Sequence, residues 1–211
     1  MRAQLLIIAK EPVPGRVKTR LCPPCSTQQA AVLAAAALAD TMGTARAVEA
    51  RRRVLVFEGR PPKGTRDFDV IPQRGTGLAE RLGCAFEDAG APALLIGMDS
   101  PQIRDRLLET SLASLDSGAF DAVFGPTVDG GYWALGLVRA DRRVFADVPM
   151  SSPETGAAQM RRLHELGMCV GILPVLQDVD HYSDALAVAS VIPASRFARA
   201  VARVERELAA A

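Results

Sequence analysis

Short apolar runs alternate along this chain with longer segments in which apolar residues recur every three to four positions. The first run, residues 5–9, shows no polar alternation, which is typical of a strand buried on both faces of a sheet. The pattern predicts strands at residues 5–9, 54–57, 68–71, 93–97, 122–124, 132–138 and 170–173. It predicts helices at residues 27–50, 78–89, 104–117, 154–166 and 193–208, with Ser26 or Thr27 capping the first and Pro193 opening the last.

The alternation of strands with helices predicts an α/β fold, with a mostly parallel central sheet covered on both faces. No internal repeat, linker or break in composition divides the chain, so we expect one domain over residues 1–211. In such sheets ligands bind in the loops that leave the carboxyl ends of the strands. We therefore expect the ligand-binding and catalytic residues in those loops.

Composition excludes several classes of function. The 25 basic residues nearly balance the 24 acidic ones, so we expect neither nucleic acid nor membrane as a partner. No apolar stretch reaches the roughly 18 residues of a membrane span, and charges follow the first apolar run too soon for a signal peptide. We therefore expect a cytoplasmic protein.

The four cysteines are expected to be reduced thiols in that compartment. Cys22 and Cys25 form a C-x-x-C motif that has a redox or zinc interpretation. The motif follows a basic loop rather than a strand, and a zinc site would need two further ligands. We interpret the motif as part of a proline-rich loop without a role of its own.

The loop after the first strand carries the clearest candidate chemistry. It contains Lys10, Gly15, Arg16, Lys18 and Arg20 together with two prolines. Glycine exposes backbone N–H groups and nearby cations attract phosphate, so this composition favours an anion site over a merely solvated basic loop. The Walker pattern is absent, which excludes a P-loop nucleotide triphosphatase.

Two later loops offer carboxylates. Asp99 ends the strand at residues 93–97, where it could cap the next helix or hold Mg²⁺ beside the phosphate loop. Residues 178–184 contain three aspartates that can supply a second metal ligand, although Ser183 or Asp184 could simply cap a following helix.

Residues 125–133 connect two predicted strands through Asp129, Gly130 and Gly131, followed by Tyr132 and the sole tryptophan. The Asp-Gly-Gly sequence is typical of a hairpin turn. Aromatic residues beside such a turn often form the wall of a pocket. The two interpretations are compatible, and Asp129, Gly130, Gly131 and Tyr132 are the candidate acceptor pocket.

Four segments, taken in chain order, resemble a bacterial family of small transferases with the GT-A fold. The segments are Lys10–Leu21, Gln73 with Gly77–Leu82, Ile96–Pro101 and Gly125–Trp133. That family is often described as glycosyltransferase-like and is related to the 2-phospholactate guanylyltransferases and the molybdenum-cofactor nucleotidyltransferases. The similarity extends from residue 5 to about residue 186. It implies a single-domain, Rossmann-like three-layer sandwich of the nucleotide-diphospho-sugar transferase type.

The resemblance also implies roles for individual residues. Lys10, Gly15, Lys18 and Arg20 correspond to the loop that binds nucleotide phosphates, and Gln73 and the backbone near Gly77 to the base-recognition segment. Asp99 matches a metal-binding aspartate. Residues 179–186 are similar to a late V-D-T-P-E-D-L segment, which places a second metal-binding aspartate at Asp180. His181 and Tyr182 stand where that segment usually has Thr-Pro.

Together these roles predict a transferase that depends on Mg²⁺ or Mn²⁺, with Lys18 and Asp99 as its catalytic residues. We expect nucleotidyl transfer from a nucleoside triphosphate to a small phosphorylated acceptor, because several cations suit a triphosphate. The first alternative is a glycosyltransferase that uses a nucleotide-diphosphate sugar. The second is a nucleotide-binding regulator without catalysis.

Overall fold

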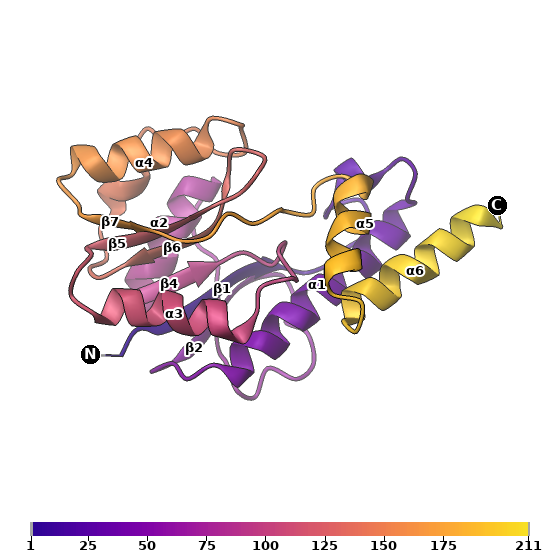
Figure 1. Ribbon diagram of the computed structural model, residues 1–211, viewed down its shortest axis with the longest axis horizontal. Helices are drawn as coiled ribbons and strands as arrows, with labels where there is room; N and C mark the ends of the chain where they lie inside the picture. Colours follow the sequence, from indigo (N-terminus) through magenta and orange to yellow (C-terminus); the bar gives the residue numbers. More distant parts are fainter. Residues whose placement is uncertain (1, 211) are drawn as a thin grey trace.

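Seven strands form one sheet in the computed structural model, which describes residues 2–210 (Figure 1). The strands are β1 (Gln4–Lys10), β2 (Arg53–Glu58), β3 (Asp69–Pro72), β4 (Ala93–Ile96), β5 (Ala122–Pro126), β6 (Tyr132–Leu137) and β7 (Val170–Ile172). Their order across the sheet is β3-β2-β1-β4-β6-β5-β7. Only β6 runs antiparallel to its neighbours in this sheet, so the mostly parallel arrangement that the sequence predicts is confirmed.

The five helices that the sequence predicts are present, and the described residues contain one further helix, at residues 182–191, and two 3₁₀ turns that the apolar pattern does not predict. The helices and 3₁₀ turns are η1 (Thr19–Leu21), α1 (Thr27–Ala47), α2 (Leu78–Ala89), α3 (Asp105–Asp116), η2 (Arg142–Phe145), α4 (Thr155–Glu165), α5 (Tyr182–Val191) and α6 (Arg196–Ala209). Ser26 caps α1 in a capping box with Gln29, as its side chain accepts from Gln29 N and its N–H donates to the Gln29 side chain. The last helix begins later than expected, because Ser195 rather than Pro193 precedes it and accepts a hydrogen bond from Ala198 N.

Two apolar cores attach helices to the two faces of the sheet. On one face, side chains such as Ile7 and Leu94 pack with Leu38 of α1 and Leu112 of α3. On the other face, a second core contains Phe86 of α2 and Leu163 of α4. The result is the three-layer α/β sandwich that the resemblance implies.

A third core lies away from the sheet, where α5 and α6 pack beside α1 (Figure 1). Leu33 of α1, Val188 of α5 and Phe197 of α6 are buried there. Leu21 and Val179, which belong to two separate loops, complete this core. Both loops also carry residues of the candidate site, so the third core helps to position that site.

No helix within residues 2–210 is both long enough and apolar enough to cross a bilayer.

Candidate functional site

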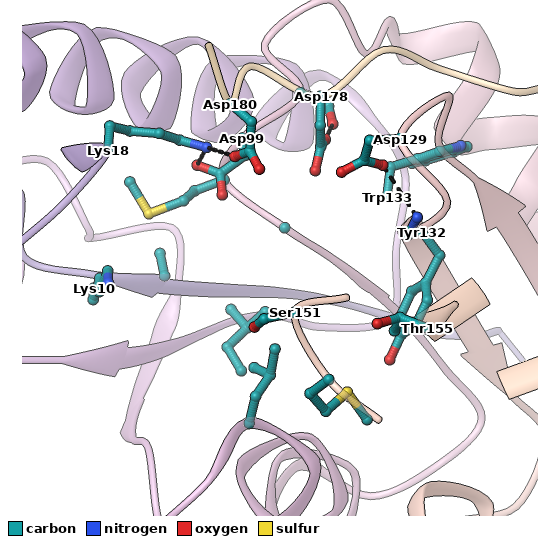
Figure 2. A pocket seen from close by; sticks show the side chains of 18 of the residues that line it. Lys10, Lys18, Asp99, Asp129, Tyr132, Trp133, Ser151, Thr155, Asp178 and Asp180 are labelled. Atoms are coloured by element: carbon teal, nitrogen blue, oxygen red, sulfur yellow. Dashed lines mark hydrogen bonds and ion pairs between the residues drawn. The ribbon is translucent and has the colours of Figure 1, made fainter. Parts of the chain in front are cut away.

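A cavity of about 900 Å³ opens beside the carboxyl ends of β1 and β4 (Figure 2). This volume lies at the upper end of the roughly 300–1,000 Å³ typical of small-molecule sites. Loops from six parts of the chain surround the cavity: those after β1, β3, β4 and β5, the segment that leads into α4, and the segment between β7 and α5. The parallel strands place these loops at one edge of the sheet, as expected.

Only some of the predicted phosphate-binding residues in the loop after β1 line the cavity. Lys10, Lys18 and Arg20 line the cavity, whereas Gly15 and Arg16 do not. Gly15 has a positive φ of 76° in an exposed turn, where a side chain would be strained. The structure therefore brings three of the five predicted phosphate-binding residues to the cavity and leaves Gly15 and Arg16 outside its wall.

Lys18 lies between two carboxylates. Its Nζ is 3.1 Å from Asp99 Oδ1 and 3.1 Å from Asp180 Oδ1, and its side chain is only 10 % exposed (Figure 2). Arg20 adds a further ion pair at 2.8 Å to Asp180 Oδ2, from a more exposed position. Lys18 has φ 47° and ψ 41° at the start of η1, a left-handed conformation that is uncommon for lysine and is often found at functional sites.

Burial and charge act in opposite directions on these groups. Desolvation lowers the pKa of Lys18, but the nearby carboxylates, Asp99 first, outweigh it and leave that pKa above its ordinary value. Burial likewise acts to raise the pKa of Asp180, whereas Lys18 and Arg20 more than compensate and lower it. Lys18 and Asp180 are therefore held in their charged forms near neutral pH.

The Asp99 and Asp180 carboxylates fit a divalent cation. Both already converge on one positive charge, the Lys18 ammonium, although they come from loops 81 positions apart. Carboxylate oxygens are the ligands that Mg²⁺ and Mn²⁺ prefer. Within residues 2–210 no group of three or more His, Cys, Asp or Glu side chains forms a complete protein site. Such an ion would therefore need water or ligand oxygens to fill its coordination sphere.

Gln73 and Gly77 also line the cavity, as do Arg81 and Glu58. The amide of Gln73 donates to the carbonyls of Ala9 at 2.7 Å and Val56 at 3.3 Å. Gly77 is the residue before α2, so the N-terminus of that helix faces the cavity. The ion pair between Arg81 and Glu58 has no counterpart among the predicted site residues.

The Asp129 loop is both a hairpin turn and part of the cavity wall. Thr127 N donates to Gly131 O at 3.1 Å, and Asp129 Oδ1 accepts from Thr127 Oγ1 at 2.5 Å and from Gly131 N at 3.1 Å. Asp129, Gly131 and Tyr132 line the cavity, but Gly130 does not. Gly130 instead contacts the first turn of α4, where its carbonyl oxygen accepts a hydrogen bond from Gly156 N at 2.7 Å.

Sequence reasoning missed two parts of the wall. Residues Met150–Thr155 form one side of the cavity, and their sequence gives no signal beyond a polar loop before a helix. Asp178 also lines the cavity and accepts a 2.5 Å hydrogen bond from Ser100 Oγ. The sequence identifies Asp178 only as one of three aspartates in residues 178–184, and its contact with Ser100 becomes visible only in the fold. Burial, partly offset by Ser100, raises the pKa of Asp178 to about 6.

The Cys22 and Cys25 thiols are free and lie just after η1. Cys25 is buried within the third core, and burial raises its pKa. A raised pKa disfavours the reactive thiolate. This environment agrees with a structural rather than a reactive role for Cys25.

A family profile described as "Uncharacterized protein conserved in bacteria (DUF2064)" matches residues 26–152, more than half of the chain. No curated protein is a significant match to the sequence.

Solved structures match the fold over nearly its whole length. A protein from Desulfovibrio desulfuricans G20, named as a candidate nucleotide-diphospho-sugar transferase, is 25 % identical with a TM-score of 0.83. That match covers 99 % of this chain and 95 % of the other. CMP:2-keto-3-deoxy-manno-octonic acid synthetase complexed with CTP is 14 % identical, covers 92 % of this chain and 99 % of its own, and has a TM-score of 0.58.

The manganese complex of Rv0371c from Mycobacterium tuberculosis H37Rv is 20 % identical to this chain, with a TM-score of 0.52. The alignment covers 89 % of this chain and 97 % of Rv0371c. These likenesses confirm the fold of the nucleotide-diphospho-sugar transferases, which the sequence resemblance implies.

Proposed function

The chain belongs to the DUF2064 family, and we propose that it is a metal-dependent transferase that uses a nucleotide donor. One observation carries the proposal: the Lys18 ammonium group lies 3.1 Å from both Asp99 and Asp180, on the wall of a cavity of about 900 Å³. Three loops that are remote in sequence meet there, and each brings a charged side chain. A solvated surface loop would not require that convergence.

The donor nucleotide is proposed to lie along β1, with its phosphates near Lys10, Lys18 and Arg20. Its base would lie toward Gln73 and the N-terminus of α2, at the other end of the same wall. The N–H groups at a helix N-terminus are suited to polar or anionic ligand groups. The fold shared with a synthetase complexed with CTP supports a nucleotide as the ligand.

Asp99 and Asp180 are the residues that would hold Mg²⁺ or Mn²⁺. When bound, the metal would neutralise negative charge on the donor phosphates. Lys18 and Arg20 would add fixed positive charge on the protein side, in a site that is already organised before the donor arrives. No side chain is required to form a covalent intermediate with the substrate.

Nucleotidyl transfer is the first form of the reaction. An acceptor oxygen forms a bond to the α-phosphorus of a nucleoside triphosphate, and the bond to the bridging oxygen breaks so that pyrophosphate leaves. The cluster of three cations favours this form, because a triphosphate carries the larger charge. Glycosyl transfer is the second form, in which a nucleoside diphosphate leaves the anomeric carbon, and the similarity to a candidate nucleotide-diphospho-sugar transferase favours it.

The proposal is tested by thermal unfolding of the protein with each nucleoside triphosphate and with common nucleotide sugars. Each ligand is measured with Mg²⁺, with Mn²⁺ and with chelator. A donor at a hundred times its dissociation constant should raise the midpoint by about 5–10 °C for a chain of this length. Stabilisation that requires metal is expected for the true donor, and its identity separates the two forms of the reaction.

Asp99→Asn should then lower turnover of the stabilising donor about 100-fold or more while the protein stays folded, since it removes a charge that holds the metal. Asp67→Asn is the matched control, because Asp67 pairs with Arg46 outside the cavity. If no nucleotide changes the midpoint under any condition, the proposed function is wrong. If a nucleotide binds without metal and Asp99→Asn binds it as tightly as the native protein does, only the hypothesis of a non-catalytic regulator remains.

A further inference from the structure

The two ends of the cavity differ in charge. We call the wall formed by residues 128–133, 150–155 and 177–178 the acceptor wall. Its lining residues include two carboxylates, Asp129 and Asp178, and no Lys, Arg or His among the residues that the structure describes. The four Lys and Arg side chains that line the cavity belong to the donor end: Lys10, Lys18, Arg20 and Arg81.

The donor-end cations are also largely engaged already. Lys18 and Arg20 are bound to Asp99 and Asp180, and Arg81 is bound to Glu58. A nucleotide donor would draw on Lys18 and Arg20, and on Lys10 as well. His181, the N-cap residue of α5, lines the cavity next to Asp180 and is exposed. The acceptor wall therefore has no lysine or arginine to offer a second anionic ligand.

The two carboxylates of the acceptor wall are presented to the cavity in an ordered way. Asp129 Oδ1 accepts from Thr127 and Gly131, and Asp178 Oδ1 accepts from Ser100, whose side chain is buried. In each case the hydrogen bonds within residues 2–210 use one oxygen and hold the carboxylate in a fixed orientation. Figure 2 shows the two carboxylates pointing toward one another from opposite loops.

Apolar surface completes this part of the cavity. The ring of Tyr132 packs at 5.3 Å on Phe124, and Met150 and Leu95 line the cavity beside it. Fixed hydrogen-bond acceptors above an apolar floor are suited to a compound with hydroxyl groups along its edges and C–H groups on its faces. A phosphate or carboxylate group would instead meet two carboxylates, with no Lys or Arg on the acceptor wall to offset them and with Lys18 already engaged by Asp99 and Asp180.

We propose that the acceptor is a polyhydroxyl compound without an anionic group, such as an unphosphorylated sugar, polyol or amino sugar. Its hydroxyl or ammonium groups donate to Asp129 and Asp178. This inference rests on the proposed function, which assigns the donor to the other end of the cavity. It replaces the phosphorylated acceptor that the sequence led us to expect.

The test compares acceptors in matched pairs. Sugars, polyols and amino sugars are titrated beside their monophosphates, for example glycerol with glycerol 3-phosphate and glucosamine with glucosamine 6-phosphate. The protein is saturated with the donor and metal found by thermal unfolding. Binding is followed by the fluorescence of Trp133, the sole tryptophan, which lines the cavity.

The unphosphorylated member of at least one pair should bind about tenfold more tightly or better, because its partner brings like charge to the acceptor wall. Asp129→Asn and Asp178→Asn, singly and together, should reduce that preference, whereas Asp67→Asn should leave it unchanged. Tighter binding of the phosphorylated members overturns the inference, as does failure of every unphosphorylated member to bind. Failure of the proposed function is distinguishable, since then no donor would stabilise the protein in the first place.

Discussion

At the scale of single residues, Lys18 holds together two carboxylates that would otherwise repel each other. Its ammonium group contacts Asp99 and Asp180 at equal distances and is nearly buried. The charges on Lys18 and Asp180 are retained because the attraction of opposite charges outweighs the desolvation of each group. A metal ion between the same carboxylates would have to compete with this ammonium group.

We therefore predict that Lys18→Met increases the affinity for Mn²⁺ about tenfold or more when no nucleotide is present, because removing an adjacent cation removes Coulomb repulsion. The affinity is measured by calorimetric titration or by the electron paramagnetic resonance signal of free Mn²⁺. The same variant should bind nucleotide more weakly, as should Lys18→Ala, since a phosphate contact is lost.

Arg20→Met is the matched control for this prediction. Arg20 contacts Asp180 alone and is mostly exposed, so its removal should change Mn²⁺ affinity less. Equal Mn²⁺ affinity in Lys18→Met and the native protein would contradict the view that Lys18 occupies the cation position.

At the scale of elements, two glycines allow the β5–β6 hairpin and the start of α4 to touch. Gly130 has a φ of +89°, and a Cβ added there would lie 2.1 Å from the carbonyl oxygen of Pro153. A Cβ on Gly156 would lie 2.8 Å from the carbonyl oxygens of both Gly130 and Gly131. This close backbone contact places residues 150–155 on the acceptor wall, which explains why Gly130 itself does not line the cavity.

Gly130→Ala is expected to destabilise the protein by about 2–4 kcal/mol, because it adds backbone strain to a steric clash with backbone atoms. Denaturant or thermal unfolding measures the loss. Gly118→Ala provides the control, as Gly118 has a similar φ of +75° and no atom within 4 Å of an added Cβ.

The control should lose only about 1 kcal/mol, the cost of the left-handed conformation alone. A similar loss for the two variants would mean that the hairpin and the segment before α4 separate easily. The close contact would then not be what positions the acceptor wall.

At the scale of the whole molecule, the third core joins the two loops that meet at Lys18. Leu21 follows Arg20, and Val179 precedes Asp180, and both side chains are buried in this core with Phe197 of α6. The site is thus attached to the C-terminal helices as well as to the sheet. Loosening that attachment should increase the mobility of the loops at the donor end of the cavity more than that of the sheet.

Phe197→Leu is expected to destabilise the protein by about 1–2 kcal/mol through lost packing in the third core. Hydrogen exchange should then rise in residues 18–25 and 178–184 ahead of the central strands, since sub-global opening follows local packing. Phe86→Leu is the control, because Phe86 is equally buried in the second core, under α2. Equal exchange in those two loops for both variants would argue against a specific connection between the third core and the site.

Much of this architecture follows from local pattern. The apolar runs of β1, β2, β4 and β5 and the repeating apolar positions of the helices identify the elements, because burial imposes a period that can be read along the chain. The loops that bear chemistry could also be located, since parallel strands bring their carboxyl ends to one edge. Most of the predicted site residues, including Lys18, Asp99 and Asp180, accordingly line one cavity.

Tertiary structure alone decided how those residues combine. Lys18 was expected to bind phosphate and proves to bridge the two aspartates, while Gly15 and Arg16 lie outside the cavity wall. Asp178 and residues 150–155 join the wall through contacts with segments far away in the sequence. Local pattern reports whether a side chain is buried, whereas the direction of a loop side chain and its charged partners depend on distant segments. The sequence by itself therefore determined most of the loops that surround the site, and the fold added residues 150–155 and determined which end of the cavity carries each charge.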